Sequence, residues 1–353
     1  MEIERGLISI LLPIYKPILK ELKVAIDSML NQTYTRFELL VLFEKSGDAA
    51  DENTDRYLAG INDIRLRVIE VPRGSGLTTS LNIGIKESRG QYLARMDGDD
   101  YSLPKRLEKQ FNFMETNPNV DLYGSAARIM NTRRIVFKKN GMSSETRAAR
   151  MMFDNAGLAH PTAFYRRLFI DKSGLRYCDV YTGYEDYRFW TDAVGLGGRI
   201  DSTDEVLLYY RVKKGQFTKH AESAIGWDRT TKKRMIEYIG EFSEYEKEAI
   251  ADWNEINSNV SYKVYHDLCR KIITENNKSK VVTDRALRRE IAFQLFVRDL
   301  RILAKKHDAK VLKGYFKEFY KPSYTGYIMR NLYHLARRLQ SYRIEVRIDQ
   351  RSN

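Results

Sequence analysis

The chain has 353 residues, of which 43% are hydrophobic, so it is long enough for one large domain with an appendage, or for two domains. Its two cysteines, Cys178 and Cys269, are too few for a disulfide framework and favour a reducing compartment. Residues 1–6 are charged and no run of about 18 apolar residues occurs, so we expect neither a signal peptide nor a membrane span.

The positive charge is concentrated near the C-terminus. The formal net charge is +13, and Asp284 to Asn353 alone hold 17 Lys and Arg against 7 Asp and Glu. Such a basic region favours an anionic partner, either a membrane surface or a nucleic acid. A solvated basic helical face is an equally good explanation.

Apolar runs and helical spacing alternate along the first 125 residues. The predicted strands are Leu7–Leu12 (ended by Pro13), Phe37–Phe43, Ile64–Val71, Tyr92–Met96 and Val120–Ser125. The predicted helices are Leu19–Leu30, a helix through Asp55 to Leu58, Thr78–Glu87 and Lys105–Glu115. This alternation predicts the α/β class, with a mostly parallel sheet flanked by helices.

Polar loops follow three of the predicted strands, at Pro13 to Tyr15, Glu44 to Asp48 and Asp97 to Asp100. Ligands of open parallel sheets bind at the carboxyl ends of the strands, so these three loops are expected to line one crevice.

Three carboxylates stand within four positions at Asp97, Asp99 and Asp100. Without compensation they would repel one another and raise one another's pKa values. Mg²⁺ or Mn²⁺ removes that cost, because both ions take oxygen ligands and leave room for substrate phosphates. Gly98 lets the backbone bend so that the carboxylates converge. The alternative is an acidic loop that caps the next helix, since Ser102 and Pro104 are typical of a helix start.

A second acidic pair, Glu185 and Asp186, opens an amphipathic helix. Carboxylates at a helix start can simply complement the helix dipole. They can also act as a general base in a crevice.

Several short motifs follow one another between about residue 7 and residue 218. They are Leu-Pro-Ile-Tyr at 12–15, Gly-Leu-Thr-Thr-Ser-Leu-Asn-Ile-Gly-Ile at 76–85, Ala-Arg-Met-Asp-Gly-Asp-Asp at 94–100, Ser-Leu-Pro-Lys-Arg-Leu-Glu-Lys-Gln at 102–110, His-Pro-Thr at 160–162, Tyr-Glu-Asp-Tyr at 184–187 and Tyr-Arg-Val at 210–212. In kind and in order, these motifs resemble those of the family 2 glycosyltransferases. The resemblance implies an inverting enzyme with the GT-A fold that uses a nucleotide sugar. It also implies a catalytic domain over 1–220, leaving a mainly helical, basic region over 221–353.

The resemblance further implies roles for individual residues. Asp186, with Glu185 beside it, would supply the catalytic base, and Asp97 and Asp99 would hold a divalent cation. The expected cofactor-binding residues, which border the nucleotide or its diphosphate, are Pro13, Tyr15, Glu44, Asn82, Asp97, His160, Arg211 and Lys213. Two of these positions depart from the common pattern: Glu44 replaces an aspartate that reads the base, and Lys213 replaces a histidine.

The expected reaction transfers a sugar from a nucleotide diphosphate sugar, with a UDP-sugar as the first expectation, to a hydroxyl of a glycan or a lipid-linked saccharide. Such polysaccharide biosynthesis would take place in the cytoplasm, without a nucleic-acid partner. A second enzyme class, the sugar nucleotidyltransferases, needs a Gly-rich basic loop after the first strand, which Pro13 to Pro17 do not provide. A third reading is a non-catalytic GT-A-like protein whose basic tail recruits it to an anionic membrane or nucleic acid.

The tail supports one more hypothesis, peripheral attachment to the inner face of the cell membrane. Helical spacing gives it an apolar face of Ile328, Leu332, Leu335, Leu339 and Tyr342, opposed by Arg330, Arg337 and Arg338 and preceded by Tyr315, Phe316, Phe319 and Tyr320. The alternative is that this face packs on the catalytic domain.

Overall fold

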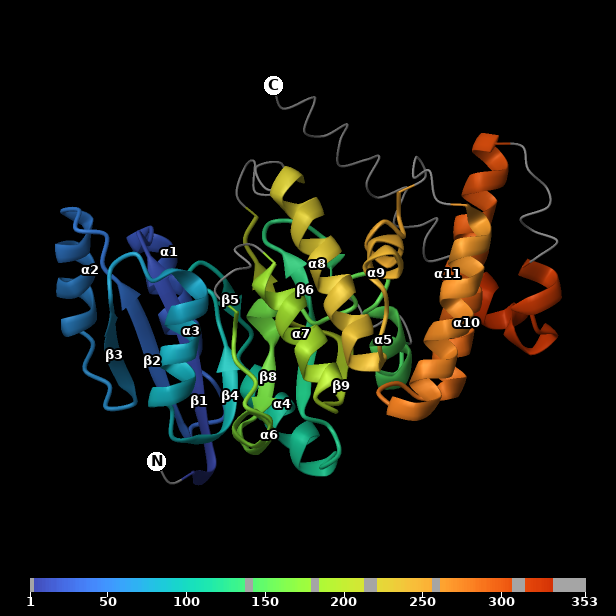
Figure 1. Cartoon of the computed structure of the whole chain (residues 1–353). Helices are drawn as coiled ribbons and strands as arrows, with labels where there is room; N and C mark the ends of the chain where they lie inside the picture. Colours follow the sequence, from blue (N-terminus) through green and yellow to red (C-terminus); the bar gives the residue numbers. More distant parts are fainter. Residues whose placement is uncertain are drawn as a thin grey trace. The chain divides into compact units, whose positions relative to one another are not determined.

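A computed structural model describes residues 3–136, 142–178, 184–212, 221–255, 261–306 and 315–332 (Figure 1). The chain forms two compact units. Unit 1 comprises Met1–Ala148 and Asn155–Thr231, and unit 2 comprises Ala149–Asp154 and Lys232–Asn353. The short segment 149–154 therefore belongs to unit 2, although the chain on both sides of it belongs to unit 1.

Unit 1 is built on one mixed sheet of nine strands within the described residues, in the order β3-β2-β1-β4-β8-β6-β9-β5, with β7 paired to β6. The strands are β1 (Glu4–Tyr15), β2 (Phe37–Glu44), β3 (Leu66–Val71), β4 (Gly90–Arg95), β5 (Tyr101–Ser102), β6 (Leu122–Ile129), β7 (Ile135–Val136), β8 (Phe164–Arg166) and β9 (Ile200–Tyr210). The predicted α/β class is confirmed.

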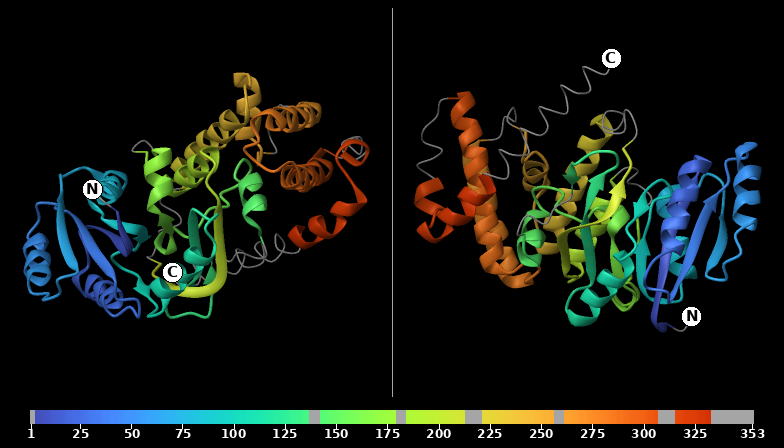
Figure 2. Two further views of the ribbon diagram at one scale, coloured as in Figure 1. Left: turned by 90° about the horizontal axis from the view of Figure 1, so that it is seen from below. Right: turned by 180° about the vertical axis from the view of Figure 1, so that it is seen from behind.

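The first half of the sheet, β3-β2-β1-β4, is entirely parallel. Its strands β1 and β2 are buried and mainly apolar over most of their length because helices cover both faces, with α1 (Leu19–Leu30) and α3 (Gly76–Glu87) on opposite sides (Figures 1 and 2). The expectation that Pro13 ends the first strand was wrong. Pro13 lies inside β1 opposite Leu42, and the strand continues to Tyr15 opposite Glu44.

The second half of the sheet is mixed. β8 runs antiparallel to both β4 and β6, β6 pairs in parallel with β9, and the two-residue β5 pairs antiparallel with the end of β9. Its strands are short or irregular, and only β6 was predicted. The remaining helical elements of unit 1 are α2 (Ala50–Ala59), α4 (Arg106–Thr116), α5 (Ser144–Arg150, which extends into unit 2), the 3₁₀ turn η1 (His160–Thr162), α6 (Arg167–Ser173) and α7 (Glu185–Gly195).

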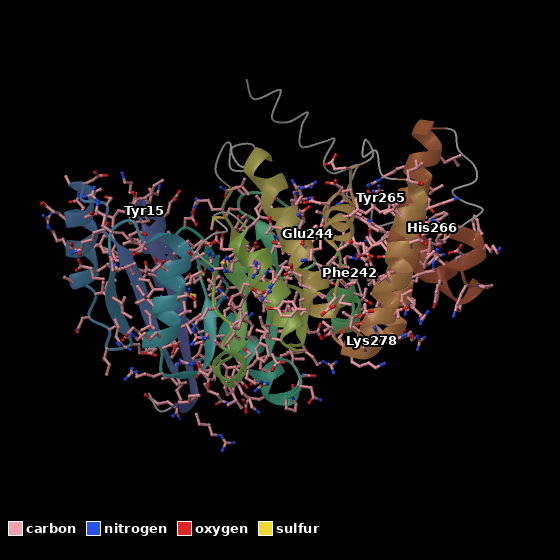
Figure 3. The ribbon with its side chains drawn as sticks, in the orientation of Figure 1. Tyr15, Phe242, Glu244, Tyr265, His266 and Lys278 are labelled. Atoms are coloured by element: carbon pink, nitrogen blue, oxygen red, sulfur yellow. The ribbon has the colours of Figure 1, made fainter. Side chains whose placement is uncertain are left out.

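Unit 2 is helical in its described part. After α8 (Ala221–Ile239), which begins in unit 1, come α9 (Glu244–Ala251), α10 (Tyr262–Ser279), α11 (Asp284–Lys306) and the 3₁₀ turn η2 (Pro322–Tyr324). Tyr265 and His266 lie on α10 (Figure 3). The Arg298 guanidinium of α11 lies 3.4 Å from the centroid of the Tyr265 ring and 5.7 Å from that of Trp253, a buried cation–π cluster.

The segment 149–154 joins this helical unit through two side chains. Arg150 Nε donates to Glu290 Oε1 of α11 over 2.8 Å, and both side chains are buried. Phe153 packs against Trp253 with ring centroids 4.7 Å apart.

The described part of the predicted apolar tail face packs inward. Ile328 is 5% exposed and lies in a cluster with Phe293 of α11 and Tyr324, and Leu332 packs against that cluster. These two residues therefore pack within the C-terminal region, and the packing of this face on the catalytic domain stays a prediction. Leu335, Arg337, Arg338, Leu339 and Tyr342 lie outside the described residues. Across the described chain, every helix is too short or too polar to cross a membrane.

Candidate active site

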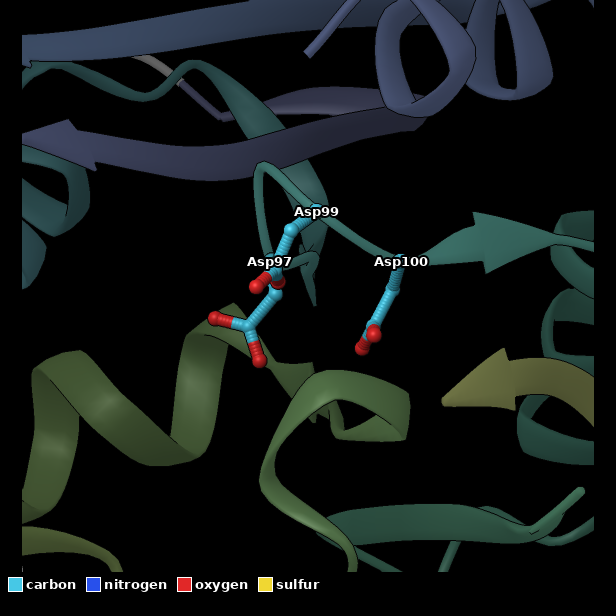
Figure 4. Close-up of side chains that lie close together, drawn as sticks. All are labelled: Asp97, Asp99 and Asp100. Carbon is cyan, nitrogen blue, oxygen red and sulfur yellow. The ribbon is translucent and has the colours of Figure 1, made fainter. Parts of the chain in front are cut away.

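Three aspartates converge in the loop that follows β4. One carboxylate oxygen from each of Asp97, Asp99 and Asp100 lies within 4.8 Å of the others, and the side chains extend into the same space (Figure 4). Asp97 and Asp99 are half-buried, whereas Asp100 is fully buried. The two predicted metal ligands therefore lie together, and the structure adds Asp100 as a third candidate.

The charge of this loop is only partly balanced by the protein. Asp97 forms an ion pair with the buried Arg95. Asp100 Oδ1 accepts the Arg211 backbone N–H over 2.8 Å, but its Oδ2 is buried and accepts no hydrogen bond from any described residue. Burial raises the pKa of Asp100 well above its usual value, and the neighbouring Asp97 charge raises it further. A divalent cation fits here, because it takes carboxylate oxygens and would partner the orphaned Oδ2.

Gly98 lies between these candidate ligands at a position that has no room for a side chain. It is absent from the glycines with positive φ. A Cβ at this position would lie 2.8 Å from Ile14 Cγ2 of β1. The predicted need for glycine therefore comes from the close approach of the loop to β1 rather than from an unusual backbone conformation.

Arg211 ties the end of β9 to the acidic loop. Besides its backbone contact with Asp100, its Nε donates to the Asp99 carbonyl over 2.7 Å. The same Nε lies 3.5 Å from Glu21 Oε1 of α1. Arg211 thus fixes the backbone of the loop from outside the carboxylate cluster. Lys213 lies outside the described residues.

Asp186 occupies the first turn of α7, after the buried Glu185. Its Oδ1 accepts the Tyr187 backbone N–H over 2.6 Å. Burial, followed by the nearby Glu185 charge, raises the pKa of Asp186 to about 7. A carboxyl with a pKa near neutrality is matched to proton transfer at physiological pH.

A buried polar chain lies beside this pair. His160 Nε2 and Tyr177 Oη are 2.8 Å apart, and Tyr177 Oη is 2.8 Å from Tyr165 Oη. His160 Nδ1 is 4.0 Å from Glu185 Oε1. Burial and the Arg95 charge hold the pKa of His160 well below its ordinary value, so its imidazole is neutral at pH 7.

Arg95 is the electrostatic link between these groups. Its guanidinium pairs with Asp97, and its charge also acts on Asp100, Asp186 and His160. The acidic loop, the start of α7 and the 3₁₀ turn at His160 therefore surround one buried cation.

Asn82 orders the segment that leads toward α7. Its Nδ2 donates to the Tyr177 carbonyl, and its Oδ1 accepts the Tyr177 N–H, both over 2.9 Å. Both ends of the amide are thus used to hold the residue whose hydroxyl contacts His160.

Glu44 and Tyr15 lie side by side at the ends of β2 and β1, as predicted for loops that share one sheet edge. Pro13, two residues before Tyr15, is half-buried, whereas Tyr15 is 56% exposed. The residue Glu44 is 5% exposed, and its two carboxylate oxygens accept the backbone N–H groups of Gly74 and Gly76 over 2.9 Å each.

The model of the family described as "Glycosyl transferase family 2" matches residues 9–174. The O-antigen biosynthesis glycosyltransferase WbnJ of Escherichia coli is 30% identical over 206 residues, which cover 57% of this chain and 78% of that protein. The chain belongs to glycosyltransferase family 2. An uncharacterized glycosyltransferase of Methanocaldococcus jannaschii, MJ1057, is 29% identical over 214 residues, which cover 60% of this chain and 72% of that protein.

The fold of this family 2 glycosyltransferase has solved relatives. A crystal structure of S. aureus TarS 1-349 in complex with UDP-GlcNAc superposes with a TM-score of 0.56 at 16% identity, covering 89% of this chain and 92% of that chain. The protein is therefore a glycosyltransferase with the GT-A fold, as the resemblance implied.

Sequence reasoning missed several residues of the transferase's site. Asp100 carried a signal, since it belongs to the acidic motif, but it was not assigned to the metal. Arg95 also stands in that motif, without a sequence feature that marks it as the buried partner of Asp97. Tyr165 and Tyr177 lie in segments that carry no recognisable pattern.

Proposed function

We propose that this enzyme is an inverting transferase that moves a sugar from a nucleotide diphosphate sugar to an acceptor hydroxyl, with a divalent cation at the acidic loop. The observation that carries the proposal is the convergence of Asp97, Asp99 and Asp100 within 4.8 Å. Asp97 and Asp99, with Asp100, would hold the cation. When bound, it would neutralise charge that builds on the leaving diphosphate.

In this proposal Asp186 removes the proton from the acceptor hydroxyl. A single displacement at the anomeric carbon then inverts its configuration, and the nucleoside diphosphate leaves. The pKa of about 7 supports the assignment, because the carboxylate can accept a proton at neutral pH and release it afterwards. Glu185 tunes that pKa through its charge.

The remaining predicted residues divide into two groups. Pro13, Tyr15 and His160 are proposed to border the nucleotide and its diphosphate. Asn82 and Arg211 are proposed to act indirectly, because their hydrogen bonds hold Tyr177 and the Asp99 backbone. The proposed base-reading role of Glu44 requires it to share oxygens that already accept two N–H groups.

The donor and the acceptor are assigned by class. We take a UDP-sugar as the first donor to test, since the S. aureus relative in fold was crystallised with UDP-GlcNAc. WbnJ is named for O-antigen biosynthesis, which supports a glycan or lipid-linked saccharide as acceptor and a place in polysaccharide assembly.

The test is hydrolysis of a panel of nucleotide sugars with Mn²⁺ or Mg²⁺, comparing the parent with Asp99→Ala. The variant should lose turnover to background while its thermal melting stays near that of the parent. Glu52→Ala, which removes an exposed carboxylate of α2, is the matched control and should keep full activity. Full activity of the parent in excess chelator would exclude the metal role.

Peripheral attachment to an anionic membrane is proposed for the region from Asp284 to Asn353. The support for this proposal is the excess of Lys and Arg over Asp and Glu in that region. The apolar residues Ile328 and Leu332 do not add to it, because they are packed inward. Each basic residue near such a surface contributes about 1 kcal/mol at low salt. Sedimentation with anionic and neutral liposomes should show salt-sensitive binding to the anionic ones only. Equal binding to both would contradict the proposal.

A further inference from the structure

A pocket of about 700 Å³ opens in unit 1 where β5, the end of β9 and the turn after β6 meet. Its described lining includes Tyr101, Arg128, Asn131, Arg133, Tyr209 and Arg211. A volume of this size is in the range of ordinary ligand sites. None of the predicted donor or metal residues lines it except Arg211.

The charge of the pocket is positive. Three of the described lining residues are arginines and none is acidic. Two described carboxylates contact the lining residue Arg211: Asp100 Oδ1 accepts its backbone N–H over 2.8 Å, and Glu21 Oε1 lies 3.5 Å from its Nε. Arg128 Nε is buried and has no hydrogen-bond partner within the described chain, so it retains an unused donor at this site. Planar guanidinium groups bind phosphate and carboxylate oxygens with paired, charge-assisted hydrogen bonds.

Two tyrosine rings line the pocket beside these arginines. The Tyr101 and Tyr209 rings are stacked, with centroids 5.9 Å apart and planes 23° from parallel. The Arg128 guanidinium lies 5.8 Å from the Tyr209 centroid, so charge and ring face the same space. Half-buried tyrosines offer an apolar face and a polar hydroxyl together, a combination that suits the ring and hydroxyls of a sugar.

The pocket shares its backbone with the acidic loop. Tyr101 directly follows Asp100, and Arg211 donates to the Asp99 carbonyl. A ligand held against Tyr101 and Arg211 would thus lie next to the loop without using its carboxylates, which would repel an anion.

We infer that this pocket binds an anionic saccharide, a sugar chain that carries phosphodiester or carboxylate groups. That this saccharide is part of the acceptor of the transferase reaction rests on the proposed function. The binding of an anionic saccharide does not rest on it, because binding requires neither donor nor cation.

The inference is tested by binding of three matched disaccharides to the full-length protein without nucleotide: one neutral, one with a glucuronic acid and one with a phosphodiester. Ligand-observed NMR and calorimetry should detect at least one anionic ligand, weakened by salt, and no neutral one. The two anionic arms distinguish carboxylate from phosphate recognition. Equal binding of the neutral disaccharide would overturn the inference.

Substitutions locate the site. Arg128→Gln should raise the Kd of the anionic disaccharide by about tenfold or more, since it removes a charge-assisted hydrogen bond. Arg128→Lys should recover part of the loss, and Tyr209→Ala should weaken binding more than Tyr209→Phe. Arg5→Gln removes an exposed arginine at the start of β1 and should leave binding unchanged. An equal loss in the Arg5 and Arg128 variants would overturn the assignment, as it would reflect net charge alone.

The experiments distinguish a wrong inference about the pocket from a wrong proposed function. Donor hydrolysis is measured on the same preparations, and it depends on Asp99 rather than on the disaccharide. Hydrolysis without disaccharide binding would refute only the pocket, whereas binding without hydrolysis would refute only the transferase chemistry proposed above.

Discussion

At the scale of single residues, the charge of the site depends on one buried guanidinium. Arg95 pairs with Asp97, and its charge works against the raised pKa values of Asp100 and Asp186. Burial still dominates at Asp186, which is why its pKa settles near 7 instead of near 4. The same burial leaves His160 neutral, so it offers a hydrogen bond rather than a positive charge.

Asp186→Asn should lower kcat by roughly 10²–10⁴, because the amide keeps the shape and loses the proton acceptor. The parent's kcat should rise with pH and level off above about 7, because only the ionised form of Asp186 accepts the proton. Initial rates from pH 5.5 to 8.5 at saturating donor and acceptor measure both effects.

A stability measurement separates this role from helix capping. Since the pKa of Asp186 is raised in the folded state, its ionisation opposes folding once the pH passes its ordinary value of 3.8, and this penalty is complete above about 7. Asp186→Asn should therefore unfold at no lower temperature than the parent at pH 8. Near-native turnover combined with reduced stability would mean that Asp186 only caps α7.

The motifs that hold the candidate site residues could be recognised in the sequence, but the partners of these residues could not, and their roles stay predictions. The acidic motif at Asp97 is continuous in the chain, and so is the pair at Asp186. Asn82 and Tyr177, by contrast, are 95 residues apart, and their pairing appears only once α3 and the segment before α7 meet.

At the scale of elements, apolar periodicity predicted the parallel strands and the helices between them. It failed at β5 and β8, which have two and three residues and are too short to show a period, and it also missed β9, which has 11 residues. It also failed at Pro13, where the sheet tolerates a residue that conventional reasoning treats as a strand end. The mixed half of the sheet is therefore the part of the fold that sequence patterns leave open.

The loop that starts α3 offers an element-scale prediction. Glu44 holds it by accepting the N–H groups of Gly74 and Gly76, which adopt φ values of +77° and +74°. Glu44→Gln replaces one acceptor oxygen with a donor that faces an N–H group. It should lower the free energy of unfolding by about 1–3 kcal/mol and speed hydrogen exchange at Gly74 and Gly76.

Glu70→Gln is the matched control for this loop. Glu70 lies on the neighbouring strand β3, its side chain is 71% exposed, and its contact is a 3.6 Å ion pair with Lys45. The same substitution there should change stability by less than about 0.5 kcal/mol. Equal effects of the two variants would show that the Glu44 contacts add nothing to the stability of the loop.

At the scale of the whole molecule, the polypeptide passes from one unit to the other more than once along the sequence. A boundary falls at Thr231 and Lys232, and the segment 149–154 leaves unit 1 to join unit 2. The predicted division at residue 220 treated the parts as consecutive in sequence and stays a prediction. No composition shift marks the crossing of 149–154, since Trp253 lies 100 residues after its partner Phe153 and Glu290 lies 140 residues after its partner Arg150.

Because segment 149–154 belongs to unit 2, we expect Phe153→Ser to have opposite effects in the full chain and in a fragment that lacks most of unit 2. In the full chain the ring is 1% exposed against Trp253, so Phe153→Ser should cost about 3–5 kcal/mol of stability. A fragment of residues 1–231 lacks Trp253 and Glu290, so the ring contact of Phe153 and the ion pair of Arg150 are removed there. There the same substitution should increase the monomeric fraction, because it removes an exposed apolar group. Chemical denaturation of the full chain and light scattering of the fragment measure the two effects. A loss of stability or of monomer in both contexts would mean that Phe153 also supports the fold of unit 1.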